Sequence, residues 1–398
     1  MLLTILLFCS LSTHSQSLLQ GIVLDAGKDK PIPSASVFLS NTSIGTKTND
    51  EGRFELWLPN GKSDLVVSSI GYATYSQTVT PGQLSGTLTI RLKPRSEELE
   101  TVVIAPYEKN GWNKWGRFFV ENFMGTMANA QQCTIANTGT IRFRYSKKNN
   151  ELSAYAASPL LIENKALGYI IHYQLETFTY DFSTHTLLYV GYPFFEPMKG
   201  TRARERKWEK RRSELYKGSL MHFMRSLFRN RIVEEGYEVR TLKKFPNLEK
   251  QRVKQAYAAN QHTSRSGGKI FITAINKDTA EYYDHILAQD DYQDVVARNL
   301  LTGDSIAYAI DSSTAGFAFP NYLLVIYKHK LAPPEYREQF PRNSTAMMSQ
   351  LLLTNGVPVE VQASGSYFNP ADLMLLGYWS WSEKIADMLP FNYQPPKE

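Results

Sequence analysis

The stretch that decides the fold is residues 21–72, which read GIVLDAGKDKPIPSASVFLSNTSIGTKTNDEGRFELWLPNGKSDLVVSSIGY. Short runs of β-branched, aromatic and other apolar residues alternate here with Gly, Pro, Asn and Asp, which favour turns. With the residues on either side, the pattern predicts seven strands: Leu19–Leu24, Ala35–Leu39, Thr46–Thr48, Arg53–Leu58, Leu65–Ile70, Thr74–Val79 and Thr87–Leu92. Seven short strands separated by frequent turns predict an all-β sandwich over residues 17–95.

The motifs of this stretch also resemble a known family. They are Gly21-x-Val23-x-Asp25, Pro31-x-Pro33-x-Ala35-x-Val37, Gly45-Thr46-x-Thr48-Asn49-x-x-Gly52-x-Phe54 and Leu65-Val66-Val67-Ser68-Ser69-Ile70-Gly71-Tyr72. This series resembles the carboxypeptidase-regulatory-like domain, a prealbumin-like (transthyretin-like) sandwich of seven strands. The resemblance implies an envelope protein of Gram-negative bacteria, but no particular chemistry, because this domain accompanies proteins of many activities.

The N-terminus predicts export. An almost unbroken apolar run, Leu2–Leu11, is too short to cross a bilayer as a helix, which takes about 20 residues. Polar residues close the run, so we interpret residues 1–16 as a signal peptide, although no Lys or Arg lies in the first 17 residues. We expect the mature protein in the periplasm or associated with the outer membrane.

The resemblance invites a peptidase hypothesis, which the residues do not favour. A zinc carboxypeptidase needs His-x-x-Glu and a distant His, but none of the seven histidines is followed three residues later by Glu. The Gly-x-Ser-x-Gly motif of serine hydrolases is missing as well. A transporter is also disfavoured, because the roughly 290 residues after the linker are too few for a 22-strand barrel. We therefore expect no catalytic residues, no metal site and no cofactor.

The rest of the chain has mixed character. Residues 96–110 predict a linker strand, and residues 111–398 predict an α+β domain of unknown function, because helices and strands do not alternate with βαβ periodicity. The expected elements are a helix at Trp112–Phe123, strands at Thr140–Tyr145, Leu152–Ala156, Tyr322–Tyr327 and Met347–Leu353, and a long antiparallel ribbon over Leu167–Tyr192. A phase change in the ribbon predicts a β-bulge, and Ser183–Thr186 its tip. Near the C-terminus, Ser380 and Glu383 predict a capping box.

One charge feature stands out. Residues 202–231 hold eleven Lys or Arg and three Glu, a net of +8, whereas the whole chain is only +6. Gly218 and Ser219 fit the end of one helix and the start of the next, so the stretch predicts a basic helical hairpin. In its second helix the apolar stripe should be buried, with His222 and Arg225 pointing elsewhere.

The basic hairpin is our candidate site. The predicted ligand-binding residues are Arg211, Arg212, Tyr216, His222 and Arg225, which would hold a phosphate, a carboxylate or an acidic glycan. The alternative is a solvated hairpin whose arginines pair with carboxylates of the ribbon. No groove-reading motif accompanies the charge, so we do not expect nucleic acid as a partner, and we expect at most peripheral membrane contact.

An acidic cluster and a lone cysteine could each be a functional site or a structural feature. The acidic residues Glu281, Asp284, Asp290, Asp291 and Asp294 lie near His285 and would suit acid-base chemistry or calcium only if the fold brings them together. Cys133, the one cysteine after the predicted signal peptide, has no adjacent base, which favours packing over catalysis.

The second region resembles the C-terminal half of carboxypeptidase-like regulatory domain-containing proteins, which carry no assigned activity. The matching motifs are Cys133-x-Ile135-x-Asn137, Pro159-Leu160-x-Ile162-x-Asn164-x-x-Leu167-Gly168-Tyr169, Tyr216-x-Gly218-Ser219-x-x-His222-Phe223-x-Arg225 and Gly377-Tyr378-Trp379-Ser380-Trp381. Our leading hypothesis is a non-enzymatic envelope protein that binds a protein, a glycan or an anionic ligand. The alternatives are an exported hydrolase of unfamiliar type and an accessory protein for outer-membrane transport or assembly.

Overall fold

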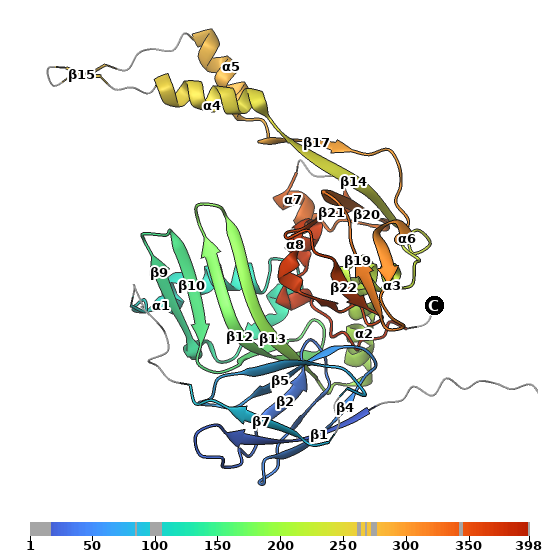
Figure 1. The fold of residues 1–398 in the computed structure, drawn as a ribbon. Helices are drawn as coiled ribbons and strands as arrows, with labels where there is room; N and C mark the ends of the chain where they lie inside the picture. Colours follow the sequence, from blue (N-terminus) through green and yellow to red (C-terminus); the bar gives the residue numbers. More distant parts are fainter. Residues whose placement is uncertain are drawn as a thin grey trace, which may run out of the picture.

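The computed structural model describes residues 17–83, 86–95, 106–260, 264–266, 269–271, 277–341 and 345–396, and within residues 257–278 it describes the backbone alone. The predicted signal peptide and residues 96–105 of the predicted linker strand lie outside these ranges. Figure 1 shows a blue sandwich below a green ribbon sheet, with a second mixed body in orange and red beside them.

The N-terminal domain is a sandwich of seven strands, as predicted. The strands are β1 (Ser17–Asp25), β2 (Ser36–Leu39), β3 (Gly45–Lys47), β4 (Arg53–Leu58), β5 (Ser63–Ser68), β6 (Tyr75–Val79) and β7 (Leu88–Leu92). They form two sheets, β4-β1-β7 and β3-β2-β5-β6, and the apolar side chains of both sheets make one core. In β4 the residues Phe54, Leu56 and Leu58 are buried while their neighbours are exposed, because successive strand residues face opposite sides.

The ribbon belongs to a six-stranded sheet. Its strands are β8 (Cys133–Ile135), β9 (Ile141–Ser146), β10 (Glu151–Ala156), β11 (Leu160–Asn164), β12 (Tyr169–Asp181) and β13 (Thr186–Pro197). β12 and β13 pair along their whole length, and the register shifts between Leu175 and Thr177, which confirms the predicted bulge. Helix α1 (Gly111–Phe123) packs its aromatic face, including Phe119 and Phe123, against this sheet.

The second body contains the basic hairpin and two further sheets. Its helices are α2 (Arg202–Tyr216), α3 (Leu220–Phe228), α6 (Gly303–Ile306), α7 (Pro334–Gln339) and α8 (Tyr378–Ser382). One sheet has the order β17-β14-β20-β21-β24, from β14 (Tyr237–Pro246), β17 (Tyr292–Val296), β20 (Tyr322–Leu331), β21 (Ala346–Leu353) and β24 (Leu373–Gly377). The other has the order β18-β19-β22-β23, from β18 (Ala307–Ala309), β19 (Thr314–Phe317), β22 (Val359–Gln362) and β23 (Tyr367–Phe368). Apolar residues of α3 and of both sheets form a core separate from that of the ribbon sheet.

An arm extends from this body. Beyond Leu242, strand β14 pairs with β17 alone, and Figure 1 shows the two strands leading away to helices α4 (Leu248–Asn260) and α5 (Lys277–Leu287). A short hairpin of β15 (Ser264–Ser266) and β16 (Lys269–Phe271) lies between those helices in the chain.

The predicted capping box near the C-terminus is wrong. Ser380 lies inside α8, where its hydroxyl donates to the carbonyl of Gly377 at 2.9 Å. Glu383 is half-buried and accepts the backbone N–H of Leu220, also at 2.9 Å. The carboxylate therefore satisfies the first turn of α3, a helix that is distant in sequence.

The sandwich is joined to the rest of the chain by backbone and side-chain contacts. The loop after β2 forms a bridge between Thr42 and Phe194 of β13, and the N–H of Phe195 donates to the carbonyl of Thr42 at 2.9 Å. The backbone of Asn41 also accepts from Phe391 in the C-terminal tail at 2.7 Å. On another side, Lys62 pairs with Glu360 of β22. Because of these contacts, the sandwich lies directly against the ribbon sheet and against the second body, and clefts lie where they meet.

Candidate functional site

The basic hairpin is built as the sequence predicts. The side chain of Thr201 accepts the N–H of Arg204 at the start of α2, and Ser219 accepts the N–H of His222 at the start of α3. Gly218 between the helices has a φ of 83°, a conformation that glycine adopts most easily. The two helices are thus short, capped and held at a fixed turn.

Trp208 fixes α2 against the ribbon sheet. Its indole N–H donates to the carbonyl of Lys165 at 2.9 Å, and the ring is buried. Gly168 has a φ of 72°, and a Cβ there would lie 2.3 Å from the Trp208 ring. Glycine at this residue allows the ring to pack against the backbone, which sets the distance between α2 and the ribbon.

A cleft of about 660 Å³ opens along α2. It lies where α2, the start of the ribbon, the sandwich loop and the C-terminal tail meet, and we call it the α2 cleft. The residues that line it are Ser43, Tyr169, Pro197, Met198, Arg202, Glu205, Arg206, Trp208, Glu209, Arg212, Pro390, Asn392, Tyr393 and Gln394. Its volume is within the range of small-molecule sites, about 300–1,000 Å³, and such sites are frequent at domain interfaces.

The α2 cleft carries positive charge that the protein does not neutralise. Its lining has three arginines and two glutamates, a balance of +1. Neither Arg202 nor Arg206 has a side-chain hydrogen bond or ion pair to any residue that the structure describes, and both are exposed. Arg212 is held in place instead: its guanidinium donates to the carbonyls of Leu167 and Gly168 at 2.7 and 3.1 Å. The cleft therefore presents two free guanidinium groups beside a fixed one.

Tyrosines complete the polar lining of the cleft. The Tyr393 hydroxyl is buried without a hydrogen-bond partner among the described residues, and burial raises its pKa to about 12. It is thus protonated at neutral pH, but its oxygen is not accessible from the cleft. Burial also raises the pKa of Tyr169, whose ring lies 4.0 Å from the Arg212 guanidinium. The free arginines suit a carboxylate or a phosphate.

Of the five residues predicted to bind a ligand, only Arg212 lines the α2 cleft. Arg211 points away and donates to the side chain of Gln132 at 3.1 Å. Tyr216, His222 and Arg225 are buried. The expectation that His222 and Arg225 point away from the buried face of α3 is wrong, because the C-terminal tail and strand β14 cover that side of the helix as well.

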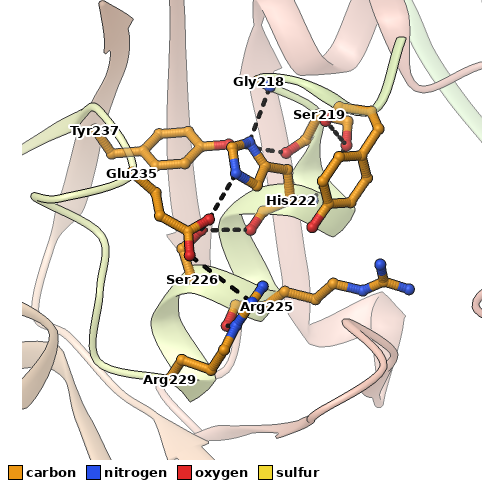
Figure 2. Close-up of polar contacts among 9 residues, drawn as sticks. Gly218, Ser219, His222, Arg225, Ser226, Arg229, Glu235 and Tyr237 are labelled. Carbon is orange, nitrogen blue, oxygen red and sulfur yellow. Dashed lines mark hydrogen bonds and ion pairs between the residues drawn. The ribbon is translucent and has the colours of Figure 1, made fainter. Parts of the chain in front are cut away.

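His222 is the centre of a buried polar network, drawn in Figure 2. Its Nδ1 atom faces two donors, the N–H of Gly218 at 3.1 Å and the hydroxyl of Tyr237 at 2.9 Å. The proton must then be on Nε2, which donates to Glu235 at 2.8 Å. Burial lowers the pKa of His222, so the imidazole is neutral at neutral pH. The Ser226 hydroxyl also lies 2.9 Å from Glu235.

A serine, a histidine and a glutamate in contact invite comparison with a hydrolase, but the geometry differs. The Ser226 hydroxyl contacts Glu235 and the carbonyl of His222, not the imidazole nitrogens. Ser226 is fully buried, so a substrate has no access to it. A nucleophile needs both a base within reach and access to substrate. The network instead joins α3 to the residues before β14.

Arg225 is occupied by the protein itself. Its guanidinium donates to the carbonyls of Ser364, Phe391 and Tyr393 at 2.8, 3.0 and 2.9 Å, and it lies over the ring of Tyr216. The alternative of a solvated hairpin paired with ribbon carboxylates does not describe it either. Arg225 holds the C-terminal tail, and the tail forms one wall of the α2 cleft.

The acidic residues are spread over the arm. Glu281, Asp284 and His285 lie on α5, whereas Asp294 lies on β17 and pairs with Lys244 at 3.1 Å. Asp291 pairs with Lys254 and Lys250 at 2.7 and 3.0 Å, contacts that lower its pKa. Among the described residues, no group of three His, Cys, Asp or Glu side chains is arranged to hold a metal ion.

Cys133 is a half-buried free thiol that contacts the carbonyl of Asn129 at 3.3 Å. Burial, with a contribution from the charge of Asp387, raises its pKa to about 12. A thiol with so high a pKa is a poor nucleophile at neutral pH. Its surroundings agree with the predicted packing role.

Sequence reasoning missed most of the cleft. Arg202, Glu205, Arg206 and Glu209 recur at intervals of three and four residues, which places them on one face of α2. That spacing could have separated them from the other charges of the stretch. Tyr393 and Asn392 carry no such signal, because they reach the cleft only through the folding of the tail.

Comparison with known proteins identifies the N-terminal domain. Residues 19–104 match the CarboxypepD_reg-like domain family, which confirms the resemblance of residues 21–72. No curated protein matches the chain.

Three solved structures are similar to parts of the chain. A protein of unknown function from Bacteroides fragilis, described as membrane-associated, has 10% identity over 87% of this chain and 93% of that chain, with a TM-score of 0.17. A DUF3823 family protein from Bacteroides ovatus has 12% identity over 47% and 83%, with a TM-score of 0.16. The TIE protein of Bacillus anthracis has 13% identity over 47% and 32%, with a TM-score of 0.17. Scores this low do not establish a shared fold.

Proposed function

We propose that this protein is a non-enzymatic component of the cell envelope that binds an anionic ligand in the α2 cleft. The ligand would be a carboxylate or a phosphate carried by a glycan or by a partner protein. The sandwich would serve as an interaction module and as one wall of the cleft, through Ser43.

The observation that carries this proposal is the pair of unpartnered arginines, Arg202 and Arg206, in a cleft of suitable volume. A guanidinium forms charge-assisted hydrogen bonds to carboxylate and phosphate, and these are stronger than neutral ones. Tyr393 lines the same cleft, although its hydroxyl is buried, so the arginines supply the donors for the ligand. Ser226 of the buried polar network around His222 is fully buried, so it is not a candidate nucleophile.

Two features support an envelope location. The apolar run Leu2–Leu11 is typical of a signal peptide, and residues 19–104 match the CarboxypepD_reg-like domain family, a resemblance that implies an envelope protein. No helix in the described parts of the chain is long and apolar enough to cross a membrane. From the apolar run and the family match, we propose that the protein is exported to the periplasm or the periphery of the outer membrane.

Calorimetric titration of the purified protein with inorganic phosphate, glucose 6-phosphate and galacturonate tests the binding. We expect at least one of these anions to bind, with an affinity that falls as salt rises. Arg206→Ala should weaken binding about tenfold, since it removes one charge-assisted hydrogen bond. Lys207→Ala is the matched control: it removes the same charge from the neighbouring residue, which does not line the cleft.

Three outcomes would contradict the proposal. They are no binding by any of the anions, equal losses for Arg206→Ala and Lys207→Ala, and binding that does not respond to salt. The non-enzymatic part has its own test, which is incubation with peptide and glycan panels followed by mass spectrometry. Turnover that a single substitution abolishes would show that the protein is an enzyme.

A further inference from the structure

A second cleft, of about 420 Å³, lies where the sandwich meets the ribbon. We call it the ribbon cleft. It is lined by Ser36, Val37, Phe38, Gly45, Thr46, Lys47, Ser68, Pro159, His172, Gln174, Phe194 and Glu196. It shares no lining residue with the α2 cleft.

The walls of the ribbon cleft come from two sheets. One wall is the sandwich surface at β2, β3 and β5, and the other is the ribbon face opposite the core that contains Tyr173. The rings of Phe38 and Phe194 meet between them, with centroids 5.4 Å apart. A Cβ on Gly45 would lie 2.7 Å from the Phe194 ring, so glycine allows this close approach.

Gln174 is the unusual residue of this cleft. Only 6% of its surface is exposed, yet its side-chain amide forms no hydrogen bond to any residue that the structure describes. The amide atoms are not among the fully buried side-chain atoms without a partner, so they reach the space of the cleft with their hydrogen-bonding capacity unused. A ligand that both donates and accepts hydrogen bonds would satisfy this amide.

The other polar groups give the cleft no net charge. Lys47 has no ion-pair partner among the described residues, and Glu196 accepts a hydrogen bond from His172 at 2.9 Å. The one lysine and the one glutamate therefore balance, unlike the arginines of the α2 cleft. The hydroxyls of Ser36 and Ser68 add further neutral donors and acceptors.

We propose that the ribbon cleft binds a neutral sugar unit of a glycan. A sugar ring presents C–H groups to an aromatic face and hydroxyls at its edge, which matches Phe194 beside Gln174 and Lys47. A phosphate or a free carboxylate would meet the carboxylate of Glu196, and a lipid chain would leave the amide of Gln174 unsatisfied. This site is independent of the α2 cleft, so either proposal can fail without the other.

The test uses Gln174→Met, which keeps the length of the side chain and removes its amide. The probes are maltotriose, cellotriose, xylotriose and chitotriose, followed by saturation-transfer NMR and calorimetry. We expect at least one to bind the native protein and the substitution to weaken that binding about tenfold or more. The melting temperature should be little changed, because the native amide forms no hydrogen bond to a described residue. Gln251→Met, at an exposed residue of α4, is the matched control and should change neither property.

A second substitution keeps the test decisive if Gln174→Met fails to fold. Lys47→Met removes an exposed, unpaired ammonium group and should weaken sugar binding without lowering stability. The proposal is wrong if no sugar binds, if both variants bind as well as the native protein, or if trialanine competes with the sugar. Arg206→Ala should leave sugar binding unchanged, which separates this site from the α2 cleft.

Discussion

Helices α2 and α3 come from one basic stretch, yet their positively charged side chains differ in whether other residues of the protein already bind them. On α2, Arg202 and Arg206 face the α2 cleft with no partner among the described residues. On α3, Arg225 is 4% exposed and donates to three backbone carbonyls, while His222 is enclosed by hydrogen-bonding groups. Of these side chains, only Arg202 and Arg206 have all their donors left for a ligand.

The comparison shows that a run of positive charge does not identify a binding site. A cation can bind a ligand only if the fold has not already brought backbone carbonyls or carboxylates to it, because a guanidinium whose hydrogen bonds are all formed has no donor left. The neighbours of α3 are a loop and the C-terminal tail, both of which offer carbonyls outside secondary structure. The C-terminal tail also borders the α2 cleft, but none of its described carbonyls forms a hydrogen bond with Arg202 or Arg206.

The largest effect should come from Arg225→Met. It leaves three carbonyls without the charge-assisted bonds that now hold them, and such bonds contribute about 1.5–3 kcal/mol each. We expect the free energy of unfolding to fall by about 3 kcal/mol or more, as measured by urea denaturation. The tail from Pro390 to Gln394 should also become accessible in hydrogen exchange, and anion binding in the α2 cleft should weaken with it.

Arg229→Met is the matched control on the same helix. The Arg229 side chain is about half exposed and lies 3.9 Å from Glu235, so its loss should cost less than about 1 kcal/mol. If the two variants were equally stable, the carbonyls around Arg225 would be contributing little. If the tail loosened without any loss of anion binding, it would not be a functional wall of the α2 cleft.

A smaller effect, of opposite sign, is expected at the start of α3. Burial raises the pKa of Glu383 to about 7, although the hydrogen bond from the Leu220 N–H favours the ionised form. As pH rises from about 4.5 to 7, the unfolded chain ionises this carboxyl before the folded protein does, so its contribution to stability is lost over that range. Glu383→Gln should therefore raise the free energy of unfolding at pH 8 by up to about 3 kcal/mol and leave it little changed at pH 4.

Unfolding curves at the two pH values check this, with Glu209→Gln as the control at an exposed residue of α2. The control should change stability by less than about 0.5 kcal/mol at either pH. A loss of stability at pH 8 for Glu383→Gln would mean that the ionised carboxylate is the form that α3 needs. The two helices would then differ less than the comparison suggests.

The parts of the fold that could be predicted are those set by neighbours in sequence. The alternation from Arg53 to Leu58 defines β4 with its correct ends, and Gly218 followed by Ser219 places the turn of the basic hairpin. The bulge near Leu175 follows from a phase change within one strand. In each case the cause and its effect lie within a few residues.

The site could be predicted only in part, because its partners are distant in sequence. The carbonyls around Arg225 belong to residues 139 to 168 positions further along the chain. No local pattern indicates them, so the sequence predicts that His222 and Arg225 point away from the buried face of α3. The capping box predicted for Glu383 is wrong for the same reason, since its partner, Leu220, lies 163 residues earlier.

Arg212 both lines the α2 cleft and donates to backbone carbonyls. Its substitution should cause the smallest of the predicted changes in stability. The carbonyls are those of Leu167 and Gly168, and the guanidinium also lies over Tyr169. Arg212→Lys keeps the charge but loses the planar fork, so we expect the free energy of unfolding to fall by about 1 kcal/mol. Arg211→Lys, which changes a single contact to Gln132, is the control and should have no measurable effect.

Phosphate binding by the Arg212→Lys variant then shows which behaviour dominates. Because the charge remains in the α2 cleft, binding should weaken less than in Arg206→Ala. A greater loss would mean that the ligand needs the fixed guanidinium rather than the free ones. In that case the arginine that binds the ligand would be one that backbone carbonyls already hold. The arginines of α2 and α3 would then differ in their access to solvent, and not in the number of hydrogen-bond donors that remain unused.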